Sequence, residues 1–324
     1  MSSTRLRVPA AAIFGAAIAF GSHAWAQGYP GKPVRMLVAT SAGSNPDTVA
    51  RVLASGLSKS FGQQVVIDNR AGAGGNIGAE LAARAPADGY TIFLAHTNHS
   101  VNATLYKKLT YDIMKDFAPI TLVALSPFVA SVHPSMPAKT LQDLIRLAKA
   151  RPGDITYASA GSGSGTFFSA EYFKGLAKVN MLHVPYKGGG PALAAVLSGE
   201  VSVYFSPIAT GLSHFRNGRL RPLAVTSKQR LPQLPDLPPI ADLLPGYEVV
   251  AWAGLLVPEN TPGEIVATIH KAALSVLNAP DTRKTLEGLG YIVVTSEPKE
   301  TSVYIAGEIG KYGKIIRQIG LPQQ

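Results

Sequence analysis

The sequence predicts an α/β protein of two lobes, each a mainly parallel sheet flanked by helices, joined by two crossover segments. From Pro33 onward, apolar runs typical of buried strands alternate with segments whose apolar residues recur at helical spacing. The chain has 324 residues, of which 46% are hydrophobic and 15% charged, so it can bury a core in each lobe. Its C-terminal part has too few strand patterns for a separate core and is expected to return to the first sheet.

The first lobe begins with strands and helices in strict alternation. Residues 34–39 are an apolar run typical of a buried strand, and residues 47–61 carry apolar side chains on one helix face. A strand at 65–67 leads through a glycine-rich turn at 68–78 into a second helix, and a third strand covers 90–95. This order is typical of parallel strands with helices on both faces of the sheet.

A long strand at 120–133 leads into the second lobe. Thr140 is predicted to cap a helix with Asp143 at its third position, and Pro152 and Gly153 end that helix. Further strands are predicted at residues 155–158, 181–186, 201–205 and 221–226.

The chain then returns to the first lobe. After an irregular, proline-rich segment at 231–245, a strand is predicted at 248–257. Thr261 is expected to cap a helix with Pro262 at its first position, and the last helix runs from near Pro298 toward Ile319.

These patterns place the lobe boundaries inside two crossovers, near residues 124–127 and 251–254. Lobe 1 is predicted to comprise residues 27–126 and 253–324, and lobe 2 residues 127–252. The crossovers are where we expect hinge rotation between the lobes.

Residues 1–26 have the pattern of a secretory signal peptide. Arg5 and Arg7 form a basic start, residues 8–21 are apolar, and Ala24 and Ala26 are small residues at the two positions that determine cleavage. Cleavage is predicted after Ala26, which would release a soluble protein into the periplasm.

The amino-acid composition excludes several kinds of site and argues against a nucleic-acid partner. The chain has no cysteine, which excludes disulfides, thiolate metal sites and cysteine nucleophiles. Its formal net charge is +10, but the basic residues are scattered and no nucleic-acid recognition motif accompanies them. A positive surface favours encounter with small anions, and we expect no nucleic-acid partner.

Two loops rich in glycine and serine are candidate anion-binding sites. Residues 156–166 run from an apolar strand pattern into a helix, and residues 40–47 follow the first strand in the same way. Such a loop presents unpaired N–H groups at the positive end of a helix. Glycine and serine are also ordinary turn residues, so one loop alone could be structural. Two such loops predict a cleft that closes on a carboxylate.

The sequence does not match two motifs that are typical of active and cofactor sites. A nucleophile elbow needs glycine two residues to either side of the serine, which both Ser162 and Ser164 lack. Ile77 stands where a dinucleotide-binding fingerprint needs its third glycine, so residues 72–78 are expected to be a tight turn that lets a helix pack on the sheet. We therefore expect no cofactor.

Several single residues allow two interpretations. Asp47 is either a helix N-cap or a holder of ligand or water, and these roles are not exclusive. His96 and His99 lack a nearby carboxylate for a zinc site, so His96 is expected to hydrogen-bond in the cleft and His99 to be a turn residue. His183 is expected to pack at a strand end, and Lys187 to be solvated.

Short motifs along the whole mature chain resemble, in order, the Bug family of periplasmic solute-binding proteins of the tripartite tricarboxylate transporter type. They are YPGKPVR (29–35), DNRAGAGGNIG (68–78), DGY (88–90), LYKKLTYD (105–112), DFAP (116–119), HVPYKG (183–188) and LAVTS (223–227).

The resemblance implies a type II periplasmic-binding-protein fold that holds a small carboxylate between its lobes. It also implies delivery of the ligand to a membrane permease made of a large and a small subunit, and a monomeric receptor without catalytic activity. The family's ligand loops correspond here to Thr40, Ser41, Ala42, Asp47, His96, Thr97, Asn98, Ala160, Gly161, Ser164, Gly165 and Thr166, with Ser206 to Ile208 closing one side.

Two departures from the family pattern bear on the ligand. Relatives often carry Pro-Gly-Gly where this chain has residues 42–44, which changes the expected path of the first loop. Many relatives carry an acid where this chain has Ser206, and a serine cannot supply the charge that would pair with a ligand amine. The expected ligand is a di- or tricarboxylate or an aromatic carboxylate without an amino group.

Two other functions remain open from the sequence. A receptor that senses a carboxylate and reports to a signalling partner would have the same cleft, and a neighbouring permease operon would favour transport instead. An exported serine hydrolase is the third reading, which an ester-turnover assay would separate from the other two.

Overall fold

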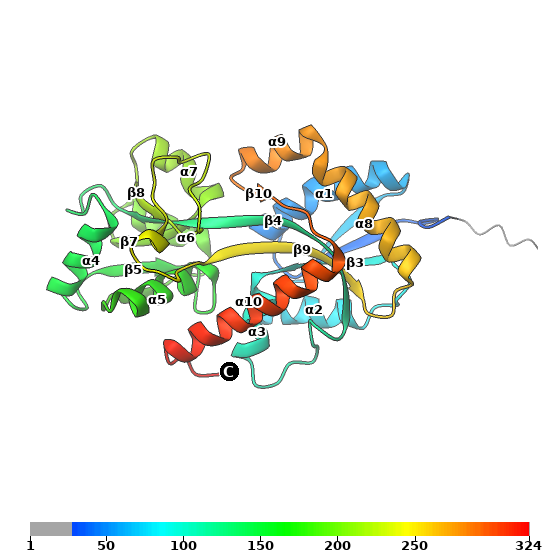
Figure 1. The fold of residues 1–324 in the computed structure, drawn as a ribbon, viewed down its shortest axis with the longest axis horizontal. Coiled ribbons are helices and arrows are strands. Elements are labelled where there is room, and N and C mark those ends of the chain that lie inside the picture. Colours follow the sequence, from blue (N-terminus) through cyan, green and yellow to red (C-terminus); the bar gives the residue numbers. More distant parts are fainter. Residues whose placement is uncertain (1–27, 324) are drawn as a thin grey trace, which may run out of the picture.

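The computed structural model describes residues 28–323, and the expected signal peptide and its cleavage site lie outside them. The molecule is elongated, with two α/β halves connected by two long strands that cross its middle (Figure 1). Within residues 28–323, no helix combines the length and the apolar character that a membrane span requires.

The first half contains the parallel strands β1 (Val34–Val38), β2 (Val65–Asn69) and β3 (Thr91–His96), with β1 between the other two. Its helical elements are α1 (Asn45–Phe61), the short 3₁₀ turn η1 (Ala73–Gly75), α2 (Asn76–Ala83), α3 (Thr97–Leu105), α8 (Gly263–Asn278), α9 (Pro280–Gly288) and α10 (Pro298–Gln318), and the short strand β10 (Ile292–Val293) also belongs to it.

The second half contains the parallel strands β5 (Thr156–Ser159), β6 (Leu182–Pro185) and β7 (Val203–Pro207), together with β8 (Arg221–Val225). Its helical elements are α4 (Leu141–Ala150), α5 (Gly165–Ala177), α6 (Gly189–Leu197), α7 (Ile208–Arg216) and the short 3₁₀ turn η2 (Ile240–Asp242).

The two crossing strands are β4 (Phe117–Val132) and β9 (Val250–Pro258), which pair antiparallel over most of the length of β9. The strands run in the order β2-β1-β3-β9-β4-β7-β5-β6, and β8 and β10 also pair with β4. Every antiparallel pairing between the strands named here involves β4 or β9. The two-lobed α/β fold is as predicted, but each sheet is mixed because long shared strands, rather than loops, connect the lobes.

The pairing of β4 changes near the predicted lobe boundary. Residues 117–127 pair with β9, whereas residues 128–132 pair with β7. Separate hydrophobic clusters cover the faces of each half, and they support the proposal that residues 27–126 with 253–324, and residues 127–252, form the two lobes. A smaller cluster joins the halves, since Phe167 and Phe168 of α5 pack against α3 and α10.

Local signals explain most helix ends. Thr140 and Asp143 form the predicted capping box of α4. At α8 the prediction was wrong by one position: Pro262 is the N-cap residue and the helix begins at Gly263, while the Thr261 hydroxyl donates to the carbonyl of Pro258. This shift is small because a proline fits equally at the start of a helix and just before it.

The glycine-rich turn before α2 has the structural role expected for it. A Cβ atom at Gly78 would lie 2.7 Å from the Cβ of Ala39 and 2.8 Å from the carbonyl oxygen of Arg70. Only glycine therefore lets α2 pack this closely on the end of β1.

Candidate functional site

A cavity of about 380 Å³ lies where the two halves meet. The first turns of α1, α3, α5, α6 and α7 line it, and β4 and β9 form one wall. Five helices thus direct their N-terminal ends toward one space, with backbone N–H groups that cannot bond within their own helix.

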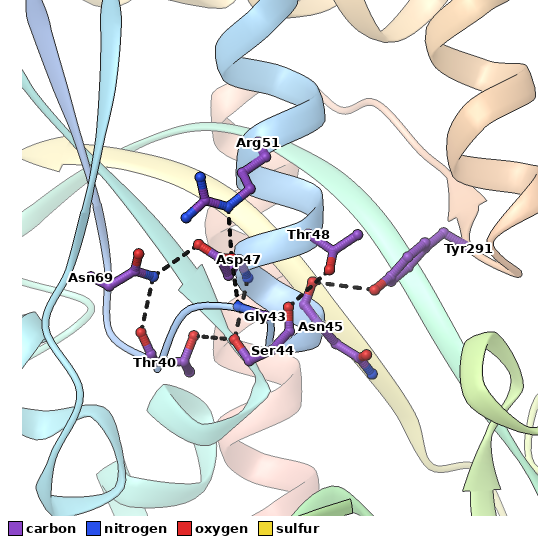
Figure 2. A network of polar contacts seen from close by, with 9 residues as sticks. All are labelled: Thr40, Gly43, Ser44, Asn45, Asp47, Thr48, Arg51, Asn69 and Tyr291. Atoms are coloured by element: carbon purple, nitrogen blue, oxygen red, sulfur yellow. Dashed lines mark hydrogen bonds and ion pairs between the residues drawn. The ribbon is translucent and has the colours of Figure 1, made fainter. Parts of the chain in front are cut away.

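The loop before α1 is held by a polar network (Figure 2). Ser44 is the N-cap of α1: its hydroxyl accepts from the amide of Asp47 at 3.4 Å and lies 2.6 Å from the hydroxyl of Thr40. From the opposite side, the hydroxyl of Tyr291 donates to the carbonyl of Asn45 at 3.2 Å. The first turn of α1 is therefore fixed by residues from both ends of the chain.

Asp47 lies at the third position of α1 and is 1% exposed. Its carboxylate accepts from the amide of Gly43 (2.8 Å), the Nε of Arg51 (2.8 Å) and the Nδ2 of Asn69 (2.9 Å), as Figure 2 shows. Burial alone would raise the pKa of Asp47, but these hydrogen bonds outweigh it and hold the pKa below the usual 3.8. Asp47 is not the N-cap, and its carboxylate oxygens are engaged within the protein.

The loop before α5 is built in a similar way. Ser164 is the N-cap, with its hydroxyl accepting from the amide of Phe167 and donating to the carbonyl of Gly161. The hydroxyl of Thr166 accepts from the amide of Ala160 at 2.9 Å. Ser164 therefore organises the helix end, and this explains its place in the Gly/Ser pattern without a nucleophilic role.

At α3 the last residue of β3, His96, caps the helix. Its Nδ1 accepts from the amide of Asn98 at 3.4 Å, and its own amide donates to Nδ1 of His99 at 3.0 Å. The hydroxyl of Thr97 accepts from the amide of Trp252 on β9 at 2.8 Å. His99 lies inside α3 and is fully buried, so its predicted place in a turn was wrong.

The wall between these helix ends is made of small residues. Ala124 and Ser126 of β4 lie opposite Ala253 and Ala251 of β9 in the antiparallel register, and all four line the cavity. Small side chains keep the crossing strands accessible from the cavity. Larger side chains close the second-lobe side of the cavity, where Phe128 and Tyr204 lie.

The charge of the cavity comes from its backbone. Among the described residues that line it, none is Asp, Glu, Lys or Arg. The aligned peptide dipoles give each helix N-terminus a partial positive charge. The cavity is therefore suited to an anion with oxygen acceptors, and it offers no counter-charge to an ammonium group.

The structure brings together eight of the residues that the sequence singled out for ligand binding. Those that line the cavity are Thr40, His96, Thr97, Asn98, Ala160, Ser164, Gly165 and Thr166. The rest, which lie next to the cavity or behind its wall, are Ser41, Ala42, Asp47, Gly161, Ser206 and Ile208.

The residues outside the lining have clear local environments. Ser41 and Ala42 are exposed on the loop before α1, and Gly161 donates its amide to the hydroxyl of Ser159. Ser206 is fully buried, with its hydroxyl 3.4 Å from that of Ser131, and Ile208 packs in a hydrophobic cluster of the second half. Pro207, which belongs to the predicted segment 206–208, and Thr210 of α7 reach the cavity.

Other lining residues were not singled out as contacts. They include Ser44, Asn45, Val49, Ser126, Phe128, Gly189, Gly190, Tyr204 and Tyr291. Ser44 and Asn45 could have been found from the helix start signal, because an Asn-Pro pair directly after a serine is typical of a first turn. Nothing local marks Tyr204 or Tyr291 as cavity residues.

The third histidine that the sequence singled out, His183, and Lys187 lie in ordinary environments. The ring of His183 stacks on Tyr157 with centroids 4.9 Å apart, and its Nε2 lies 2.6 Å from the hydroxyl of Ser159, as expected for packing at a strand end. Lys187 is exposed, as predicted. Within residues 28–323, no group of three or more His, Cys, Asp or Glu side chains is arranged to hold a metal ion.

Comparison with known proteins agrees with this geometry. The family described as tripartite tricarboxylate transporter family receptor, TctC, matches residues 49–321. Protein BugT of Bordetella pertussis is 33% identical and the match covers 99% of both chains. A protein from the tcbD-tcbE intergenic region of Pseudomonas sp. strain P51 is 34% identical, with 89% of this chain and 86% of that protein covered.

Solved structures show the same fold. An R. palustris protein with adipate has a TM-score of 0.82 and 34% identity, and the match covers 90% of this chain and 98% of that one. MatC from Rhodopseudomonas palustris, with bound malate, has a TM-score of 0.78 and 31% identity, with 89% and 100% covered. The periplasmic binding protein BugD has a TM-score of 0.81 and 31% identity, with 91% and 100% covered.

These matches span nearly the whole described chain, and they confirm both the resemblance to the Bug family and the fold that it implies. The chain belongs to the tripartite tricarboxylate transporter receptor family, TctC, together with the Bug periplasmic solute-binding proteins.

Proposed function

We propose that this receptor captures a small carboxylate without an amino group in the periplasm and delivers it to a tripartite tricarboxylate transporter permease. The observation that carries this proposal is the cavity itself: five helix N-termini converge on it, and no described lining residue carries a formal charge. Backbone N–H groups and hydroxyls would bind the carboxylate oxygens. The relatives with bound adipate and malate support this ligand class.

The described lining has no carboxylate side chain that could pair with a ligand amine, and Ser206 is buried outside the lining. An amino acid ligand would bring an ammonium group into a space where five helix dipoles have their positive ends. Without a counter-charge, burying that ammonium is costly. We therefore expect aspartate to bind more weakly than succinate, which has the same chain length and no amine.

The mechanism of capture follows from the position of the cavity between the halves. Groups from α1 and α3 lie on one side, and groups from α5 and α6 lie on the other. A ligand that contacts both sides favours the arrangement in which the halves are close together. Residues 124–127 and 251–254 would absorb the rotation, because β4 exchanges β9 for β7 as its pairing partner directly after Pro127. The closed form would then dock on the two-subunit permease.

Trp252 provides the test. It is the only tryptophan in residues 27–324, is 2% exposed and lines the cavity. Purified protein should be titrated with succinate, adipate, citrate, benzoate and aspartate, following tryptophan emission and melting temperature. A ligand at 100 times its Kd should stabilise the fold by about 2.7 kcal/mol. Preferential binding of aspartate, or silence with every carboxylate from ligand-free protein, would contradict the proposal.

A further inference from the structure

The loop before α5 is anchored to the neighbouring strand through one side chain. Ser159, the last residue of β5, is fully buried, and its Oγ accepts from the amide of Gly161 at 3.1 Å. The same Oγ lies 2.6 Å from Nε2 of His183 on β6, the strand that pairs parallel with β5. Within the described chain, this is the only hydrogen bond by which a side-chain hydroxyl of residues 159–167 reaches a residue outside that segment.

Gly161 connects this anchor to the end of α5. Its amide is held by Ser159, and its carbonyl oxygen accepts from the hydroxyl of Ser164, the N-cap residue, at 2.7 Å. Ala160 and Ser164, on either side of the turn, line the cavity. Ser159 and His183 lie outside the lining. The position of a turn that lines the cavity therefore depends on two side chains that do not.

The hydrogen bond between Ser159 and His183 has one direction. The amide of Gly161 can only donate, so it occupies a lone pair of the Ser159 oxygen. Among the described residues, Nε2 of His183 is the one acceptor within reach of the hydroxyl proton of Ser159. The ring is therefore the acceptor at Nε2, and in its neutral form it carries its proton on Nδ1.

The surroundings of His183 keep the ring neutral and fix its plane. Burial is the main cause that lowers the pKa of His183 below the usual 6.5; the carboxylate of Glu171 opposes this shift, and the ammonium of Lys174 adds to it. The imidazole stacks on Tyr157 with ring centroids 4.9 Å apart, and Phe167 of α5 lies 5.0 Å from it. A neutral ring in a fixed plane presents its lone pair to Ser159.

We infer that His183 is a positioning residue for ligand binding: by accepting the Ser159 hydroxyl, it fixes the backbone of residues 160–164 at the cavity. The inference rests on the proposed function of the cavity as a carboxylate site. It goes beyond the packing role that the sequence indicates for His183, because it makes the affinity for a ligand depend on a residue outside the lining.

The physical reason is the cost of leaving buried polar groups unpaired. Without an acceptor at the position of Nε2, the hydroxyl proton of Ser159 is left unpaired, unless Ser159 turns away and releases the amide of Gly161. Both alternatives favour a displaced or looser turn. A looser turn binds a ligand more weakly, because more conformational freedom is lost when the ligand orders it.

The test compares two substitutions with opposite expectations. His183→Phe keeps a ring that can stack on Tyr157 but removes the acceptor, whereas His183→Gln supplies an amide oxygen that can accept near the position of Nε2. His133→Phe is the matched control, because His133 also contacts a serine hydroxyl, 2.7 Å away on Ser135, but lies outside the cavity lining. Binding is measured by calorimetry at neutral pH with whichever of succinate, adipate, citrate and benzoate binds the wild type most tightly.

We expect His183→Phe to lower the affinity about tenfold, as for the loss of one buried hydrogen bond. His183→Gln should recover most of that loss, and His133→Phe should bind as the wild type does. Ser159→Ala should lower the affinity by itself, and adding His183→Phe to it should cost little more, because the connection is already broken. In ligand-free protein, amide hydrogen exchange in a peptide covering residues 159–167 should be faster in His183→Phe than in the wild type.

Several results would overturn the inference while leaving the carboxylate site in place. They are an unchanged affinity or unchanged exchange in His183→Phe, an affinity of His183→Gln as low as that of His183→Phe, and an equal loss from His183→Phe in the Ser159→Ala background. Melting temperatures without ligand verify that the variants fold, and if His183→Phe is unfolded, His183→Leu takes its place in every comparison. If none of the four acids binds the wild type, the proposed function fails and the inference fails with it.

Discussion

Replacing Asp47 by asparagine should destabilise the protein and loosen one side of its cavity. The carboxylate accepts three hydrogen bonds through two oxygens, from Gly43, Arg51 and Asn69. An asparagine has one acceptor oxygen, so Asp47→Asn must place an NH₂ group against at least one donor. Asn69 cannot simply turn over, because its Nδ2 also donates to the carbonyl of Thr40.

The expected magnitude follows from burial. The side chain of Asp47 is 2% exposed, so water does not replace what is lost. A hydrogen bond to a charged group contributes about 1.5–3 kcal/mol, and we expect Asp47→Asn to cost about 2 kcal/mol. At about 2–4 °C per kcal/mol, the melting temperature at pH 7 should fall by about 4–8 °C.

The stabilising contribution of Asp47 should depend on pH in a definite direction. The pKa of Asp47 is lower in the folded protein than its usual 3.8, so its stabilising contribution is complete well above pH 3.8 and is lost as the pH falls through the lowered value. Asparagine does not titrate. The difference in melting temperature between wild type and Asp47→Asn should therefore shrink on acidification below pH 3.8.

Arg51→Gln is the matched control. The Arg51 side chain is 55% exposed, so solvent screens its ion pair with Asp47, and we expect Arg51→Gln to destabilise the protein much less than Asp47→Asn. Thermal melts of all three proteins between neutral and acid pH make the comparison. The reasoning is refuted if Asp47→Asn melts within 1 °C of the wild type at pH 7, or if the difference persists undiminished in acid.

Three further outcomes are expected. In thermal melts, Gly78→Ala should destabilise the protein by about 1–3 kcal/mol, because the new Cβ would collide with Ala39. The control is Gly307→Ala on α10, where the new Cβ would meet open space. This change should leave the stability unchanged or raise it by up to about 1 kcal/mol. Calorimetry with the bound carboxylate should give an affinity that is nearly constant from about pH 6 to pH 8, since His96 stays neutral there; a pronounced step would contradict it. N-terminal sequencing of exported protein should show cleavage after Ala26, and an intact leader would contradict that assignment.

Most strands and helix ends could be predicted because they depend on residues that are close together in the sequence. Strand and helix patterns repeat within a few residues, and turns depend on glycine, proline and serine at fixed positions. The strands before the two Gly/Ser loops and the capping box at Thr140 were identified within a residue or two. The predicted elements occur in the predicted order, but the helices α3, α6, α7 and α9 and the short strand β10 were not predicted.

The alternation of strands and helices could not reveal how the two sheets connect. Strand β4 begins three residues before the predicted Ile120 and pairs with β9 on one side and with β7 and β8 beyond Pro127. Antiparallel pairing between segments that are far apart in the sequence leaves no periodic mark in either segment. The mixed sheets therefore appear only in the folded chain.

By itself, the sequence determined the fold class, the family and the two Gly/Ser loops at helix starts, because each depends on residues close together in the chain or on the order of short motifs. Only the tertiary structure decided which side chains face the cavity. Asp47 turned inward because Asn69 and Arg51 offered donors there, and Tyr291 reached the first turn of α1 from a position 246 residues away from Asn45. Whether a polar group binds ligand or protein depends on the nearest partner in space, which the register of distant strands and the packing of helices decide.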